Sequence, residues 1–177
     1  MITRIFDKNK FQISKIISKY GKEHFNRYTY NENRFFSTLN QKVRENITLN
    51  IEENKTLLAL KLAINKCKTT KKYVFYRGLS KNSSSVFNDF IELNKIKLMK
   101  GIISTSLDYS VAKQYSEKEK YQVILKINVP VNYNCFPVLN NSKHIEEHEI
   151  LFYNLKYKVI NYLLKENKLF AEIDVLA

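Results

Sequence analysis

The segment from Glu146 to Glu149 (EEHE) places three carboxylates within four residues. Glu147 and Glu149 are two positions apart, so in a β-strand both side chains lie on the same face. Two carboxylates held side by side repel each other unless a cation or a cationic transition state lies between them. Considered alone, the pair is more typical of an exposed acidic strand. It becomes a candidate site for stabilising positive charge only if other segments support it.

A second candidate is the segment over residues 75–79 (FYRGL), where Arg77 ends a predicted strand immediately before Gly78. A guanidinium is a planar, two-pronged donor suited to a phosphate. A glycine lets a flat ligand approach the backbone closely. Alone, this pair is more typical of a surface arginine beside a turn.

A third candidate is the segment over residues 101–106 (GIISTS), where two isoleucines predict a buried strand that ends in three hydroxyls. Ser104, Thr105 and Ser106 could orient a carboxylate or contact a sugar at the strand end. The alternative is a cap for the next helical turn, a role that Ser106 and Asp108 could fill. The segment alone does not decide between these interpretations.

The elements that must position these residues change type near residue 72. Before it, apolar residues recur with a helical period. The predicted helical faces are Ile13, Ile16, Ile17 and Tyr20, then Phe36, Leu39 and Val43, then Leu57, Leu60, Ile64 and Cys67. The last face belongs to a helix from about 51 to 67, for which Asn50 and Glu53 form a plausible capping pair.

After residue 72 short strands are expected, because β-branched and aromatic residues alternate with polar ones. The predicted strands cover residues 73–77, 98–105, 123–129, 149–153, 157–160 and 169–175, with short helical segments over 86–93 and 111–115. Helices first and strands later predict an α+β domain. The glycine-rich loops of dinucleotide folds are absent from the sequence.

Taken together, in this order and spacing, the three segments resemble the Arg-Ser-Glu class of mono-ADP-ribosyltransferases, which includes arginine- and actin-modifying exotoxins. The resemblance covers roughly residues 50–176. It implies N-terminal helices packed on two mainly antiparallel sheets that enclose an NAD cleft. It also implies an enzyme that transfers ADP-ribose from NAD to a protein arginine, releases nicotinamide and needs no metal.

The resemblance also implies a role for each motif residue. Arg77 would bind an NAD phosphate, and the Gly78 backbone would hold the nicotinamide amide. Ser104 would position Glu149, which would grip the nicotinamide ribose and stabilise the oxocarbenium ion. The residues implied to contact NAD are Arg77, Gly78, Ser104, Thr105, Ser106 and Glu149; those implied to be catalytic are Arg77, Ser104, Glu147 and Glu149.

Glu147 would engage the acceptor. A glutamate here matches arginine-modifying members, whereas the asparagine-modifying branch carries glutamine. A protonated guanidinium is a poor nucleophile, so a neighbouring carboxylate base makes chemical sense. Many toxin members have an aromatic residue three positions earlier, where this chain has His144. The loop over residues 138–147 is therefore unusual, and the target stays undefined.

The chain of 177 residues carries a net charge of +13, and most of the excess lies in the first 72 residues. That charge favours an acidic protein target, with a nucleic acid as the less favoured partner; a solvated basic face is the alternative. Hydrolysis of NAD and an inactive binding module are the other functions considered. We expect one domain (1–177), whose residues 1–70 are helical and basic.

The start of the chain lacks the pattern of a secretory signal, and no apolar run is long enough to cross a bilayer. We therefore expect a monomer in the cytoplasm without membrane insertion, made there or delivered into a host cell. Two cysteines, Cys67 and Cys135, are too few for a disulfide framework or a zinc site, and we expect both to be reduced.

Overall fold

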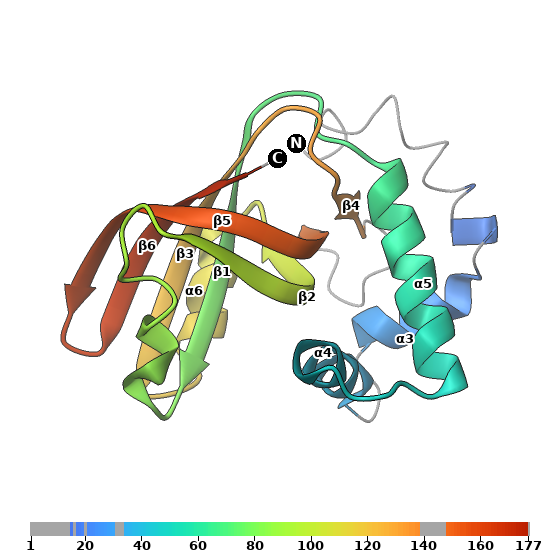
Figure 1. The fold of residues 1–177 in the computed structure, drawn as a ribbon, viewed down its shortest axis with the longest axis horizontal. Helices are drawn as coiled ribbons and strands as arrows, with labels where there is room; N and C mark the ends of the chain where they lie inside the picture. Colours follow the sequence, from blue (N-terminus) through green and yellow to red (C-terminus); the bar gives the residue numbers. More distant parts are fainter. Residues whose placement is uncertain (1–14, 16, 20, 31–33, 139–147, 177) are drawn as a thin grey trace.

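The computed structural model describes residues 15, 17–19, 21–30, 34–138 and 148–176. Helices come first and strands later, which confirms the α+β class (Figure 1). The helices are α3 (Lys22–Tyr30), α4 (Phe35–Glu45), α5 (Ile51–Lys66) and α6 (Tyr109–Ser116), with a 3-10 turn η2 (Ser84–Phe87). The strands are β1 (Tyr73–Lys81), β2 (Ile96–Ser106), β3 (Tyr121–Val129), β4 (Phe136–Pro137), β5 (Glu149–Lys165) and β6 (Lys168–Val175).

Helix α5 begins at the predicted capping pair. The Glu53 N–H donates to Asn50 Oδ1 at 2.8 Å, and the Asn50 N–H donates to Glu53 Oε2, also at 2.8 Å. Lys42 Nζ on α4 lies 2.8 Å from Glu53 Oε1, so the buried carboxylate is paired as well as hydrogen-bonded. The cap therefore fixes the start of α5 and also ties it to α4.

The predicted helical faces are largely confirmed where the structure describes them. The buried members are Ile17, Leu39, Leu60, Ile64 and Cys67, and the half-buried ones are Phe36, Val43 and Leu57. Ile13, Ile16 and Tyr20 lie outside the described residues. The three helices α3, α4 and α5 lie together on one side of the strands (Figure 1).

The six strands form one hydrogen-bonded sheet in the order β2-β1-β3-β6-β5-β4, and β5 also pairs with β2. The β3–β6 pair is parallel and the other pairs are antiparallel. The two sheets expected from the resemblance are thus two parts of a single sheet. The reason is the length of β5, which pairs with β2 over its first half and with β6 over its second.

Strand β5 covers two segments that were predicted as separate strands, 149–153 and 157–160. Residues between them stay paired because the strand bends through irregularities rather than ending. Asn154 adopts a left-handed backbone conformation (φ 52°), and its Oδ1 accepts a 2.8 Å hydrogen bond from the N–H of Gly101 on β2. The register of β2 shifts between Met99 and Ile102 at the same place, as a β-bulge does.

The prediction of a helix over residues 86–93 is wrong. Only the turn η2 forms, capped by the Ser83 hydroxyl, which accepts from the Ser85 N–H at 3.3 Å. Beyond it Leu93 pairs with Val159 of β5, and Asn94 has a left-handed conformation (φ 59°) that no helix continues through. Tertiary pairing with β5 thus overrides the local helical pattern.

The core lies between the sheet and the helices. On β3 the predicted alternation is confirmed, with Val123, Leu125, Ile127 and Val129 all buried. Cys67 and Cys135 are buried and form no disulfide, and burial raises their thiol pKa values to about 11 and about 12. None of the described helices is both long enough and apolar enough to cross a bilayer.

Candidate active site

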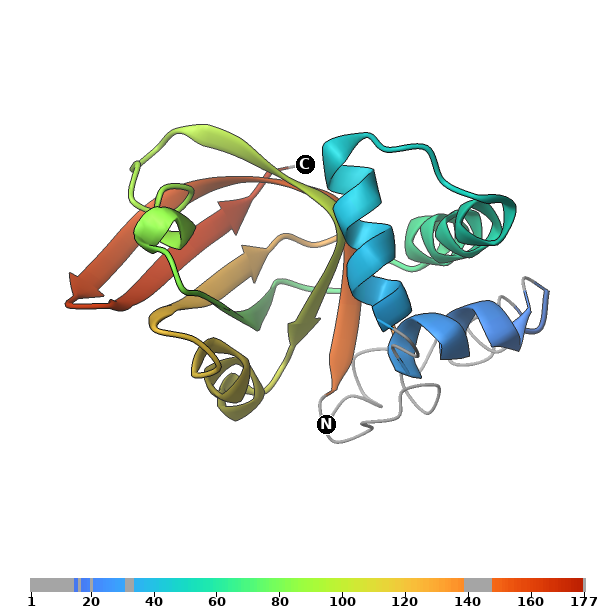
Figure 2. The ribbon, with the colours of Figure 1, turned by 90° about the horizontal axis from the view of Figure 1, so that it is seen from below.

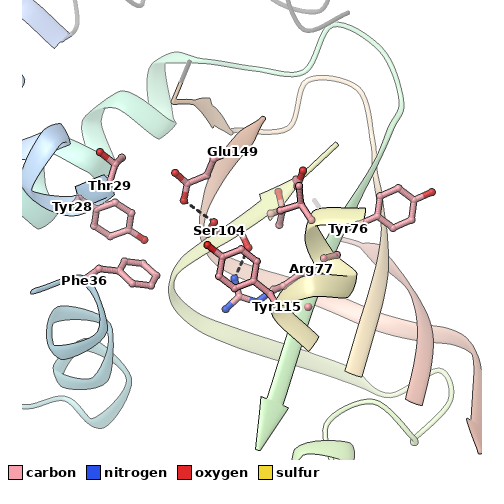
Figure 3. Close-up of a pocket in the computed structure, with 13 residues that line it drawn as sticks. Tyr28, Thr29, Phe36, Tyr76, Arg77, Ser104, Tyr115 and Glu149 are labelled. Atoms are coloured by element: carbon pink, nitrogen blue, oxygen red, sulfur yellow. Dashed lines mark hydrogen bonds between the residues drawn. The ribbon is translucent and has the colours of Figure 1, made fainter. Parts of the chain in front are cut away.

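A pocket opens where α3, α4 and α6 face the strands β1, β2 and β5 (Figure 3). Its cavity volume is about 220 Å³, and its mouth is open to solvent. It is lined by six of the seven residues that the motifs singled out: Arg77, Gly78, Ser104, Thr105, Ser106 and Glu149. The seventh, Glu147, lies outside the described residues, as does His144.

Ser104 and Glu149 meet across the β2–β5 pair. The antiparallel register puts Ser106 opposite Glu149, so Ser104, two residues away, shares that face. Ser104 Oγ donates a 2.6 Å hydrogen bond to Glu149 Oε1 (Figure 3). This length is typical of a hydroxyl bound to an ionised carboxylate. Glu149 is also the first residue of β5, and His148 before it has a left-handed φ of 48°.

Arg77 lines the pocket and is half-buried. Its Nη1 donates to the carbonyl of Ser104, while its Nε has no hydrogen-bond partner among the described residues. Burial lowers the pKa of Arg77 to about 10, and the nearby Tyr28 and Glu149 raise it against the repulsion of Arg44. The guanidinium is therefore charged at neutral pH, yet it forms no ion pair with a described carboxylate. Such a group favours an anionic ligand.

Gly78 is required by the packing of α6. A Cβ at this position would lie 1.9 Å from the Ala112 carbonyl oxygen and 2.7 Å from the Ser116 nitrogen. The space that a side chain would need is thus occupied by the helix, which lies directly on β1. Gly78 still lines the pocket, but this close approach explains the glycine without a ligand.

The three hydroxyls at the end of β2 make different contacts. Ser104 contacts Glu149, whereas Thr105 Oγ1 donates to the Ile150 carbonyl at 3.0 Å. Ser106 Oγ accepts from the Asp108 N–H at 2.9 Å, and Asp108 Oδ1 in turn accepts from the Ser110 N–H at the start of α6. The capping interpretation therefore holds for Ser106 and Asp108. Ser104 is the hydroxyl that orients a carboxylate.

The aromatic residues of the pocket were not identified from the sequence. Tyr28 from α3 points its hydroxyl into the pocket, and Phe36 from α4 lies beside it with the rings edge to face, 4.6 Å apart (Figure 3). Tyr76 and Tyr115 line the opposite side. Sequence periodicity assigns a helix face to the core but does not show which of its residues border a cavity. Among the described residues, no group of three or more His, Cys, Asp and Glu could hold a metal ion.

No protein-family model matches the sequence, and no curated protein sequence matches it. Solved structures do match: the chain has the fold of the mono-ADP-ribosyltransferase toxins. Plx2a, an ADP-ribosyltransferase toxin from Paenibacillus larvae, is 20% identical, with a TM-score of 0.69 over 97% of this chain and 96% of that one.

Two further structures extend the likeness. Exoenzyme S from Pseudomonas aeruginosa, solved with human 14-3-3 protein beta and carba-NAD, is 17% identical, with a TM-score of 0.73 over 97% and 84% of the two chains. The ADP-ribosyltransferase Vis of Vibrio splendidus, solved with agmatine, is 16% identical, with a TM-score of 0.68 over 95% and 86%. At these identities the likeness concerns the fold.

Proposed function

We propose that this chain is an NAD-dependent mono-ADP-ribosyltransferase that transfers ADP-ribose to an arginine of a protein target. The observation that carries the proposal is the hydrogen bond between Ser104 and Glu149 beside the half-buried Arg77, in one pocket of this fold. Each of the three predicted motifs contributes one of these residues. Chance convergence of three unrelated surface segments would not place them together around a cavity.

NAD binds with its pyrophosphate near Arg77. A half-buried guanidinium that forms no ion pair with a described carboxylate is stabilised when a phosphate supplies the opposite charge, and the fork geometry suits two phosphate oxygens. Support for NAD as the substrate comes from exoenzyme S, whose structure contains the analogue carba-NAD. Tyr28 and Phe36 border the same space and offer an aromatic wall to the ligand.

Glu149 acts on the nicotinamide ribose. The bond between the ribose anomeric carbon and the nicotinamide nitrogen breaks, and its electron pair leaves with neutral nicotinamide. The sugar becomes an oxocarbenium ion, which the carboxylate stabilises electrostatically. The Ser104 hydroxyl holds one carboxylate oxygen and thereby fixes the other toward the sugar. Acceptor attack at the anomeric carbon completes the transfer.

The acceptor is a guanidinium that must lose a proton as its nitrogen attacks. Glu147, two positions before Glu149, is the carboxylate we assign to orient it and take that proton. Support for a guanidino acceptor comes from Vis, which was solved with agmatine, a small guanidino compound. The target is an acidic protein, since the chain carries a net charge of +13. We propose that the enzyme is a monomer that acts in the cytosol.

The test is incubation of the protein with NAD labelled in its adenylate part and a cell lysate, with and without protease or nuclease. The proposal predicts a labelled macromolecule that is destroyed by protease and unaffected by nuclease. Neutral hydroxylamine should release the label, as expected for an ADP-ribosylated arginine. Nuclease-sensitive label would assign a nucleic-acid target. Free ADP-ribose without labelled macromolecules would assign NAD hydrolysis. No consumption of NAD at all would overturn the proposal.

A further inference from the structure

Asn40 is a buried polar residue on α4 whose side chain reaches the strand that carries Ser104. It is 1% exposed, and its Oδ1 accepts a 2.9 Å hydrogen bond from the N–H of Ile102. That N–H belongs to the irregular part of β2, where Gly101 has a φ of 88° and the register shifts. Figure 2 shows α4 lying beside the end of β2. The amide oxygen of Asn40 is therefore committed to the strand.

The amide nitrogen of Asn40 is not committed. Asn40 Nδ2, Tyr28 Oη and Arg77 Nε are three of the buried side-chain atoms that have no hydrogen-bond partner among the described residues. Leaving such atoms unpaired is costly, so each calls for an explanation. Tyr28 and Arg77 line the pocket. A group bound there is the natural partner for both.

Asn40 lies one turn beyond Phe36 on the same face of α4, and the Phe36 ring packs edge to face against Tyr28 at 4.6 Å, so Asn40 and Tyr28 are neighbours. Burial and the charge of Glu149 raise the pKa of Tyr28 well above its usual range, while the Asn40 amide lowers it. A neighbour that lowers a phenol pKa presents a donor to the phenol oxygen. Because Oδ1 of Asn40 is held by Ile102, the end of the side chain that faces Tyr28 is the NH₂ group, which can only donate.

We propose that Asn40 is a positioning residue that sets the direction of the Tyr28 hydroxyl proton when NAD occupies the pocket. With Asn40 Nδ2 donating to Tyr28 Oη, the phenol can no longer donate toward α4. Its proton is then directed into the pocket, toward an acceptor oxygen of the ligand. This inference rests on the proposed function, because the ligand is NAD.

The decisive variant is Asn40→Asp, which keeps the shape and an oxygen for the Ile102 N–H but removes the NH₂ donor. A carboxylate only accepts, so Tyr28 would donate to it and turn its proton away from the pocket. We expect Tyr28→Phe alone to weaken NAD binding about 3- to 10-fold, the effect of one neutral hydrogen bond. In the Asn40→Asp background, Tyr28→Phe should change binding less than twofold. Calorimetry with NAD measures each step of this double-mutant cycle.

A matched control separates this role from simple support of the bulge. Asn154→Gly removes the other side chain that holds the bulge, the 2.8 Å contact to Gly101, and glycine accepts its φ of 52°. In that background Tyr28→Phe should still cost its full 3- to 10-fold, as expected for one hydrogen bond. Should Asn40→Asp fail to fold, Asn40→Ala replaces it in the cycle; alanine neither donates nor accepts, so the phenol proton is left undirected and the cost of Tyr28→Phe should fall below its wild-type value.

Two other outcomes distinguish the inference from the proposed function. If the wild-type protein binds NAD but Tyr28→Phe costs the same in the Asn40→Asp or Asn40→Ala background as in the wild type, the inference is overturned and the proposed function stands. If the wild-type protein binds no NAD, both are overturned together.

Discussion

Ser104 on β2 and Glu149 on β5 lie 45 positions apart in the sequence and are joined by a hydrogen bond of 2.6 Å. The bond holds one oxygen of the carboxylate in a fixed position beside the pocket. A hydrogen bond to a charged group is typically worth about 1.5–3 kcal/mol. The link is thus strong enough to set the orientation of Glu149.

Replacing Ser104 by alanine should therefore lower the rate of nicotinamide release about 10- to 100-fold, in line with that range. The effect should appear mainly in kcat, because the carboxylate is disordered rather than lost. Nicotinamide release is followed by chromatography at saturating NAD. Ser37→Ala on the exposed side of α4 is the control and should behave as wild type.

Glu149→Gln should abolish both transfer and NAD hydrolysis, since it removes the charge that faces the oxocarbenium ion. Losing one well-placed electrostatic group typically costs about 100- to 1,000-fold in rate. Both activities are measured on the same preparation, together with its urea unfolding curve. Activity within about tenfold of wild type, well short of this loss, would remove Glu149 from the catalytic set.

Arg77→Lys should weaken NAD binding although it preserves the charge. A compact ammonium on a flexible stem cannot reproduce the two-pronged donor, and it loses the contact with the Ser104 carbonyl. Calorimetry should show a weaker affinity with an intact unfolding transition. An unchanged dissociation constant would mean that Arg77 only supports the strand ends.

Glu147→Gln should separate the two activities that fall together in Glu149→Gln. Water needs little activation once the oxocarbenium ion has formed, whereas a guanidinium must be oriented and deprotonated. We expect NAD hydrolysis to persist while transfer to agmatine or a protein arginine is lost. Equal losses would make Glu147 part of the NAD site, and full retention of transfer would contradict an arginine acceptor.

Gly78→Ala should destabilise the fold, because its Cβ would lie 1.9 Å from the Ala112 carbonyl oxygen. Relief requires α6 to move away from β1, and overpacking of this kind costs typically about 1–3 kcal/mol. Urea unfolding measures the change. Lys81→Ala at the exposed end of the same strand serves as the control. Equal urea unfolding midpoints for the two variants would show that α6 can move away from β1 at little cost in stability.

Local patterns predicted a large share of the fold. The capping pair at Asn50 and Glu53 and the alternation along β3 are short-range features, and both are confirmed. The patterns failed where distant pairing decides the outcome. Leu93 pairs with Val159 instead of continuing a helix, and β5 runs through a bend that sequence periodicity reads as an end.

The residues of the candidate site also fall into those that local sequence patterns reveal and those that depend on distant packing. Arg77, Ser104 and Glu149 stand out because charged or hydroxyl residues at strand ends are visible in a sequence. Tyr28 and Asn40 do not, since their importance depends on how α3 and α4 pack against β2. The sequence also suggested that Gly78 is a glycine so that a ligand can approach the backbone. The structure shows that the close packing of α6 requires the glycine.

The half-buried guanidinium of Arg77, which forms no ion pair with a described carboxylate, has a consequence for heat stability. A cation held largely away from water, with the second cation Arg44 nearby, makes the fold less stable than its packing would allow. Any small polyanion that reaches it binds the folded chain in preference to the unfolded one, and a hundredfold excess over its dissociation constant adds about 2.7 kcal/mol. Pyrophosphate alone, without nicotinamide or ribose, should therefore raise the melting temperature. Thermal shift is thus a simple screen for compounds that enter this pocket.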